Sequence, residues 1–205
     1  MTPYRFSACC LLLGSFLFAA SDSGLPSDAQ VVIFDGISTG FKAEGWGGVT
    51  PVSEAKALRL IVTEKATPWC GMFLKAKSPM AFEWPATKLY LVFFVNGDDD
   101  TFGTHIGIQK LQFSLSSQKV AFSKNGYMPL SSFIEGGAVD RDPATWQRVV
   151  VPLAKLDRAA EQTAVDTLFF QYVAEAPKAG IRIATMYFTV TAPAPPAPRV
   201  ETKGA

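Results

Sequence analysis

Four aromatic residues stand near turns or strand ends, where a flat ring can stay exposed to a ligand. They are Trp46, Trp69, Trp84 and Tyr127. Rings of this kind stack on the apolar C–H face of a pyranose sugar and keep a polar edge in water. Trp84 precedes Pro85, which restricts its backbone to an extended conformation and favours an outward ring. Packing in the core or at its rim is the alternative for each tryptophan, because large aromatic side chains are mostly buried.

Polar residues in apolar segments could supply the hydrogen bonds that sugar hydroxyls need. Gln112 and Ser114 alternate with apolar neighbours, so we expect them to face away from the core layer. Arg148 and Gln171 fall in otherwise apolar strands, where an unsatisfied buried polar group costs roughly 1–3 kcal/mol. If these four side chains share one concave face of a sheet, they line a groove.

The sequence shows no constellation of catalytic residues. The single histidine, His105, has no serine or aspartate motif around it, and the G-x-S-x-G, H-E-x-x-H and Cys/His metal-binding spacings do not occur. A glycosidase needs only two carboxyl groups, roughly 5 to 9.5 Å apart. The acids that could serve are Glu83, Glu135, Asp140 and Asp142. We therefore predict a protein that is not an enzyme, with a glycoside-active enzyme as the catalytic alternative.

Residues 1–21 are predicted to be a signal peptide. Arg5 supplies the positive start, residues 9–20 form an apolar run, and small residues follow at 19–21. The run is too short for a transmembrane helix, which needs roughly 20 apolar residues, although an uncleaved anchor remains the alternative. The prediction is an exported chain, periplasmic or extracellular, with an N-terminal extension at 22–29 and no transmembrane segment after cleavage.

Cleavage would also change the charge and the cysteine count. Removing Arg5 from the 19 basic residues leaves 18, against 18 acidic residues, and no basic cluster stands out. Nucleic-acid binding requires a concentrated basic face and is disfavoured. Cys70 would be the remaining cysteine, so no intramolecular disulfide is expected. It lies in an apolar segment, which favours a buried structural thiol.

The rest of the chain is predicted to form short strands separated by turns. The expected strands are residues 30–34, 57–63, 69–75, 88–96, 105–116, 119–123, 146–152, 167–174 and 180–191. We expect a β-bulge near residues 109–110, where the apolar phase shifts. A long irregular loop is expected at 125–143, a turn of helix at 157–164, and a Pro/Ala-rich disordered tail at 192–205.

The segment 145–156 gives the clearest strand in the chain. Val149, Val150 and Val151 favour an extended backbone, and Pro152 has no N–H to donate, so it belongs at a strand end. The two leucines at 153 and 156 are expected to turn back onto the core as a short cap. Trp146, at the start of the strand, is expected to be a core residue.

This order of elements resembles the galactose-binding-like β-jelly-roll domains, which include carbohydrate-binding modules attached to secreted glycoside hydrolases. The resemblance covers residues 30–191 and rests on the segments 30–36, 69–74, 89–96, 112–115 and 146–153. It implies an all-β fold, an antiparallel β-sandwich of jelly-roll topology. Members of this superfamily often hold a structural calcium through paired acids in the last strand.

The corresponding segment here, residues 183–188, contains no acid, so a structural Ca²⁺ site is in doubt. Calcium needs six to eight oxygen ligands. Asp35, Asp98 and Asp100 are the weak candidates, and a solvated turn is the simpler explanation of the aspartates at 98–100.

The leading hypothesis is an exported, non-catalytic domain that binds a polysaccharide or oligosaccharide. Its ligand-binding candidates are Trp46, Trp69, Trp84, Gln112, Tyr127, Arg148 and Gln171. The alternative is a structural or protein-interaction domain without a sugar ligand, whose partner would be another exported protein. An exposed aromatic strip would favour sugar, whereas a broad aliphatic patch would favour a protein partner.

Overall fold

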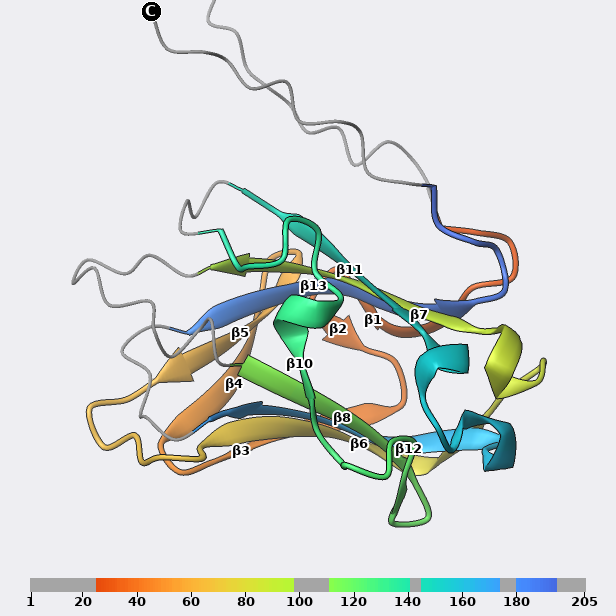
Figure 1. Cartoon of the computed structure of the whole chain (residues 1–205). Helices are drawn as coiled ribbons and strands as arrows, with labels where there is room; N and C mark the ends of the chain where they lie inside the picture. Colours follow the sequence, from red (N-terminus) through yellow and green to blue (C-terminus); the bar gives the residue numbers. More distant parts are fainter. Residues whose placement is uncertain (1–24, 98–110, 141–144, 174–179, 195–205) are drawn as a thin grey trace, which may run out of the picture.

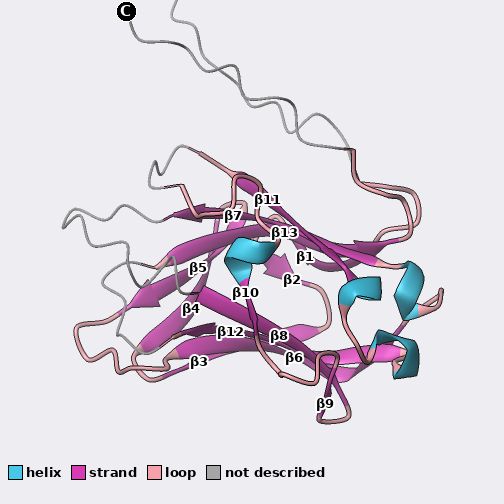
Figure 2. Cartoon of the chain, viewed as in Figure 1, coloured by secondary structure: helices cyan, strands magenta, loops and turns pink. Residues whose placement is uncertain are grey.

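Alternating buried and exposed side chains fold this chain into two antiparallel sheets that pack face to face. The computed structural model describes residues 25–97, 111–140, 145–173 and 180–194. Figure 1 shows the two layers, and Figure 2 shows that strands dominate, with short helical turns at one end and another beside β10. The predicted all-β class and antiparallel sandwich are confirmed.

Seven strands form the first layer, sheet A. They are β1 (Gln30–Phe34), β2 (Ile37–Ser38), β4 (Val49–Glu54), β5 (Ala57–Val62), β7 (Tyr90–Gly97), β11 (Gln147–Pro152) and β13 (Ile181–Thr189). Their order is β11-β7-β13-β1-β2, and β5 also pairs with β13 and carries β4.

Six strands form the second layer, sheet B. They are β3 (Phe41–Trp46), β6 (Gly71–Ala81), β8 (Leu111–Ser117), β9 (Val120–Ala121), β10 (Met128–Pro129) and β12 (Ala164–Tyr172). Their order is β10-β8-β12-β6-β3, with β9 paired to β8. From β6 onward the long strands alternate between the sheets, which is jelly-roll connectivity.

Four short 3₁₀ helices complete the described elements. They are η1 (Ala86–Lys88), η2 (Leu130–Ser132), η3 (Leu153–Lys155) and η4 (Ala159–Glu161). The fourth lies in the polar connection where a turn of helix was expected. No helix among the described residues has the length and apolar character to cross a membrane.

The core lies between the two sheets and is rich in phenylalanine. Phe170 of β12 is buried, with its ring centroid 5.7 Å from that of Phe93 and 6.5 Å from that of Phe113. These three rings come from both sheets and hold the layers together through apolar burial. From Thr167 to Tyr172 of β12, buried residues alternate with partly exposed ones, so every second side chain in this part of the strand faces outward.

The valine-rich strand forms as predicted, with β11 ending at Pro152. Val149 and Val151 are fully buried, and Leu153 and Leu156 turn back onto the core through η3. The prediction for Trp146 was wrong, because its side chain is 40% exposed. Strand alternation explains the error: the inward position next to Val149 is residue 147, and its neighbour at 146 must face outward.

Gln147 therefore occupies an inward position where an apolar residue was expected. Its side-chain amide donates to the carbonyl oxygens of Glu135 at 2.9 Å and Ala138 at 2.8 Å, and its Oε1 accepts from the backbone N–H of Asp140. These hydrogen bonds compensate the burial of a polar side chain.

Two regions are more ordered than the sequence indicated. The glycine-rich stretch around Trp46 forms β3 and β4, joined by Gly47 and Gly48, whose positive φ angles of 64° and 87° suit a tight turn. Part of the expected irregular loop pairs with β11: Glu135 donates its N–H to Arg148 O, and Val150 donates to Phe133 O, both at 3.0 Å.

Several predictions concern residues outside the described ranges. The signal peptide, the β-bulge near 109–110, His105, and the tail from 195 onward all lie there and stay predictions. The start of β8 at Leu111 falls within the strand expected at 105–116.

Asp28 connects the chain before β1 to the chain after β13. Its carboxylate accepts hydrogen bonds from Thr189 Oγ1 at 2.7 Å, from the Val190 N–H at 2.6 Å, and from the N–H and Oγ1 of Thr191 at 3.1 and 2.9 Å. Burial alone would raise the pKa of this carboxyl, but the hydrogen bonds together outweigh burial and lower the pKa from 3.8 to about 2. The charged form is therefore the one that the fold stabilises.

Replacing this carboxylate, as in Asp28→Asn, should lower the free energy of unfolding by about 1–2 kcal/mol at neutral pH, since solvent screens part of the interaction at this half-buried site. The native pKa is depressed, so the contribution is complete above pH 3.8 and is lost as the pH falls toward about 2. Urea unfolding of both proteins across this range measures it, and the two curves should converge at low pH. A difference that stays constant with pH would contradict a role for the charge.

Candidate functional site

Four aromatic side chains form a continuous row across the outer face of sheet B. Trp46 of β3 stacks on Phe73 of β6, with ring centroids 6.2 Å apart and planes at 26°. Phe73 lies 6.0 Å from Phe169 of β12, and Phe169 lies 6.3 Å from Tyr127, which precedes β10. All four side chains are partly exposed. We call these residues the aromatic row.

Strand register brings the central rings together. Phe73 and Phe169 are cross-strand partners in the β6–β12 pair, and Ser114 of β8 is the next partner of Phe169. Residues directly opposite on one face of an antiparallel pair have their Cβ atoms about 5 Å apart. Two rings that lie far apart in the sequence therefore become neighbours.

The Trp46 end of the row depends on a glycine. Trp46 is the cross-strand partner of Gly71, and the indole lies so close that a Cβ on Gly71 would be 2.9 Å from two of its ring carbons. The same Cβ would be 2.1 Å from the carbonyl oxygen of Phe170. Absence of a side chain at Gly71 therefore lets the indole lie across β6.

The carbonyl of Trp69 fixes two side chains on this face. It accepts a hydrogen bond from Trp46 Nε1 at 2.7 Å and one from Gln171 Nε2 at 3.2 Å. Gln171 Oε1 in turn accepts from Gln112 Nε2 at 2.8 Å. A connected set of polar groups thus runs beside the aromatic row and orients the indole and both amides.

Trp69 itself has an unusual backbone. Its φ angle is +64°, in the left-handed region that a bulky residue rarely adopts, and its side chain is 50% exposed. Such a conformation costs on the order of 1–3 kcal/mol and persists where surrounding contacts impose it. Here it directs the carbonyl toward Trp46 Nε1 and Gln171 Nε2, while the side chain stays half exposed.

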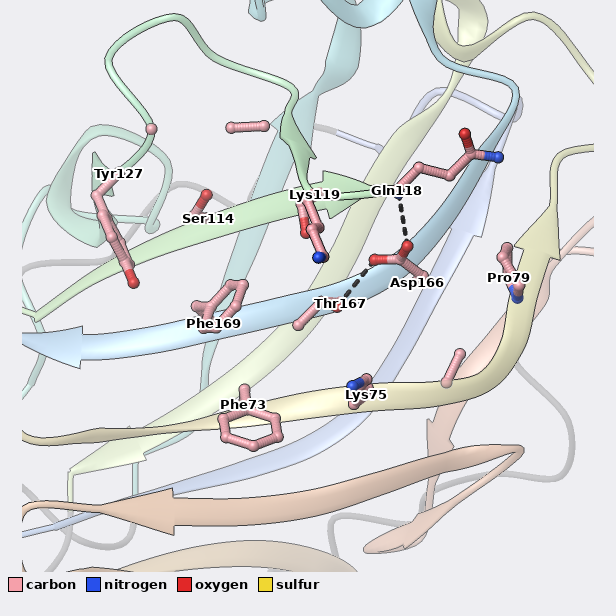
Figure 3. Close-up of a pocket in the computed structure, with 14 residues that line it drawn as sticks. Phe73, Lys75, Pro79, Ser114, Gln118, Lys119, Tyr127, Asp166, Thr167 and Phe169 are labelled. Carbon is pink, nitrogen blue, oxygen red and sulfur yellow. Dashed lines mark hydrogen bonds between the residues drawn. The ribbon is translucent and has the colours of Figure 1, made fainter.

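A groove of about 790 Å³ opens over part of the aromatic row. Figure 3 shows Phe73, Phe169 and Tyr127 on one side of it and the turn at Gln118 and Lys119 on another. Asp166 accepts hydrogen bonds from the Gln118 N–H at 2.6 Å and from Thr167 Oγ1 at 2.8 Å. Burial raises the pKa of the Tyr127 hydroxyl, so it is a neutral hydrogen-bonding group at neutral pH.

Most residues singled out in the sequence lie on this face. The structure brings together Trp46, Trp69, Gln112, Tyr127 and Gln171, and Ser114 lies with them on the groove side of β8. The prediction that Gln112 and Ser114 face away from the core is confirmed.

Two predicted ligand-binding residues lie elsewhere. Arg148 belongs to sheet A, where its Nε donates to Glu135 Oε1 at 2.6 Å and its Nη2 donates to the carbonyl of Ala194. It therefore does not share a face with the two glutamines. Trp84 is partly buried and packs against the core beside η1.

Sequence reasoning missed Phe73 and Phe169. Each is flanked by buried residues, so each falls in the outward phase of its strand. The alternation of apolar residues along the strand could have identified Phe169 as exposed. Leu168 and Phe170 point inward, so an aromatic residue between them must face outward.

The described residues form no recognisable metal-binding site. No group of three or more histidine, cysteine, aspartate or glutamate side chains occurs there, and Asp35 lies in the β1–β2 turn with φ of 48°. One acid does not fit the ligand number that calcium requires. Asp98 and Asp100 lie outside the described ranges, so calcium binding stays a prediction.

Cys70 is a buried free thiol, as predicted. Desolvation raises its pKa, which keeps it protonated and unreactive at neutral pH.

No family model matches the sequence, and neither does any curated protein. Several solved structures are similar to it. A point mutant of a family 29 carbohydrate-binding module, from work on ligand recognition, is 14% identical; the match covers 79% of this chain and 91% of the module, with a TM-score of 0.47. Another family 29 module is 16% identical, with 78% and 88% covered and a TM-score of 0.47. An exo-1,3/1,4-beta-glucanase from a Pseudoalteromonas species is 16% identical, with 82% of this chain but 21% of the enzyme covered and a TM-score of 0.48.

Proposed function

We propose that this chain is a non-catalytic carbohydrate-binding domain whose aromatic row stacks on successive sugar rings of a polysaccharide or oligosaccharide. The main support for this proposal is the aromatic row itself, in which neighbouring ring centroids lie 6.0 to 6.3 Å apart. Its members are Trp46, Phe73, Phe169 and Tyr127. Partly exposed rings in a line on an outer sheet face are unusual, because that face normally carries polar side chains.

The polar groups beside the row support the same ligand class. Gln112 and Gln171 each carry a donor and an acceptor, and their mutual hydrogen bond leaves further capacity for sugar hydroxyls. Stacking would hold the flat faces of the sugar, and the amides would select its hydroxyl pattern. A broad aliphatic surface, which a protein partner would favour, is not what this face offers in the described residues.

The proposal that the domain is non-catalytic follows from the acids near the groove. Glycosidases use a pair of carboxyl groups on either side of the scissile bond. Among the described residues that line the groove, Asp166 is the single carboxylate, and both its oxygens accept hydrogen bonds within the protein. We further propose that the domain works outside the cytoplasm, on the strength of the leader predicted at residues 1–21.

A glycan array and a pull-down with insoluble polysaccharides, with and without calcium, test the proposal. The wild-type chain should bind saturably, and Trp46→Ala should weaken binding by about tenfold, the loss of one stacked ring. Trp146→Ala is the matched control, because Trp146 is exposed and directly precedes β11 of the opposite sheet. Circular dichroism confirms that both variants fold. Absence of binding across plant, algal and bacterial glycans would reject the proposal.

A further inference from the structure

Two lysine side chains line the groove beyond the aromatic rings. Lys75 extends from β6 and Lys119 from the turn between β8 and β9, and both are exposed. Figure 3 shows Thr167 between them in this view, and Thr167 is the cross-strand partner of Lys75. Both ammonium groups therefore border one hollow.

Neither lysine is neutralised by the residues that the structure describes. In the described parts of the chain, no ion pair or hydrogen bond engages either ammonium group, whereas the nearby Lys42 pairs with Glu44 at 2.7 Å. Lys42 is also the direct cross-strand partner of Lys75. Like charges in this position destabilise a sheet, so Lys75 adds positive charge to the face, and no described residue compensates it through an ion pair.

The acid in the groove has another role. Asp166 holds the turn of Lys119, since its Oδ2 accepts from the Gln118 N–H at 2.6 Å. Gln118 and Lys119 have φ angles of +48° and +69°, in the left-handed region that non-glycine residues rarely adopt. That hydrogen bond thus stabilises a strained turn, which keeps Lys119 at the groove, and the described lining retains two cations against one anion.

We propose that this lysine pair binds an anionic substituent of the glycan, so that the ligand is an acidic polysaccharide carrying carboxylates or sulfate esters. The inference rests on the carbohydrate-binding function proposed above. Stacking on Phe73 and Phe169 holds the sugar rings, and the two ammonium groups select the charge. Both groups are exposed, so the charge interaction weakens as salt screens it.

Matched glycan pairs separate charge from backbone. The purified chain is titrated with polygalacturonate and its methyl ester, and with κ-carrageenan and its desulfated form, alongside neutral glucan and mannan. The first pair tests a carboxylate and the second a sulfate ester. The Lys75→Gln/Lys119→Gln double variant is compared with Lys88→Gln/Lys155→Gln, whose two lysines are exposed and do not line the groove.

The acidic member of at least one pair should bind about tenfold more tightly than its neutral partner, and added NaCl should reduce the difference. The groove double variant should lose that preference, while the control double variant keeps it. Equal binding of acidic and neutral members, or a groove variant with unchanged preference, overturns the inference and leaves sugar binding intact. No binding to any acidic or neutral glycan overturns both.

Discussion

Replacing Phe169 by alanine should remove most glycan binding and leave the sandwich folded. Phe169 stands in the middle of the aromatic row, 6.0 Å from Phe73 and 6.3 Å from Tyr127, so its loss interrupts the stacking surface rather than shortening it. A central aromatic anchor contributes about 2 kcal/mol or more to binding, a loss of about 30-fold in affinity. Isothermal titration with the glycan found in the screen measures the change.

The neighbouring residue provides the control for this prediction. Phe170 faces the core, 5.7 Å from Phe93, and Phe170→Ala should cost about 3–5 kcal/mol of folding free energy through the cavity it creates. Two adjacent phenylalanines should therefore give opposite phenotypes, one in binding and one in thermal stability. Unchanged affinity of a folded Phe169→Ala protein would show that the row is not the binding surface.

Gly71→Ala should damage both the sheet and the binding face. The added Cβ would meet the Phe170 carbonyl oxygen at 2.1 Å and the Trp46 ring at 2.9 Å. The first contact is with backbone of the adjacent strand, so β6 and β12 must separate locally, and the second pushes the indole off the row. We expect a loss of about 3 kcal/mol in the free energy of unfolding and weakened glycan binding.

Gly40→Ala separates steric crowding from backbone preference. Gly40 has a φ of +79°, but a Cβ there would have no atom within 4 Å. Its replacement should cost about 1 kcal/mol, the penalty for a left-handed alanine alone. Urea unfolding of both variants makes the comparison. Equal losses of unfolding free energy in the two variants would mean that the strands adjust to the added Cβ at Gly71 without an extra energetic cost.

Much of the fold could be predicted because it depends on local patterns. The valine run of β11, its proline end and the apolar stretch of β7 each required only neighbouring residues. β3 and β4 were missed because glycines and a proline weaken their strand signal, and they form through pairing with β6 and β5.

The site was harder to predict because it depends on register. Trp46, Gln112, Tyr127 and Gln171 were identified by residue type, whereas Phe169 was hidden beside a core phenylalanine. Which rings become neighbours follows from long-range pairing, a property that no local segment contains. The error at Trp146 has the same origin, since successive residues of a strand point alternately into the core and into solvent.

The Asp28 hydrogen bonds also determine how the domain responds to tension. β1 and β13 are antiparallel, with Gln30 opposite Phe188, so the incoming and outgoing segments lie side by side at one end of that pair. A force that pulls these segments apart would break the hydrogen bonds between β1 and β13 one after another from that end. The bonds from Asp28 to Thr189, Val190 and Thr191 would break first. Both segments join sheet A, so a tether at either one pulls on the sheet opposite the aromatic row.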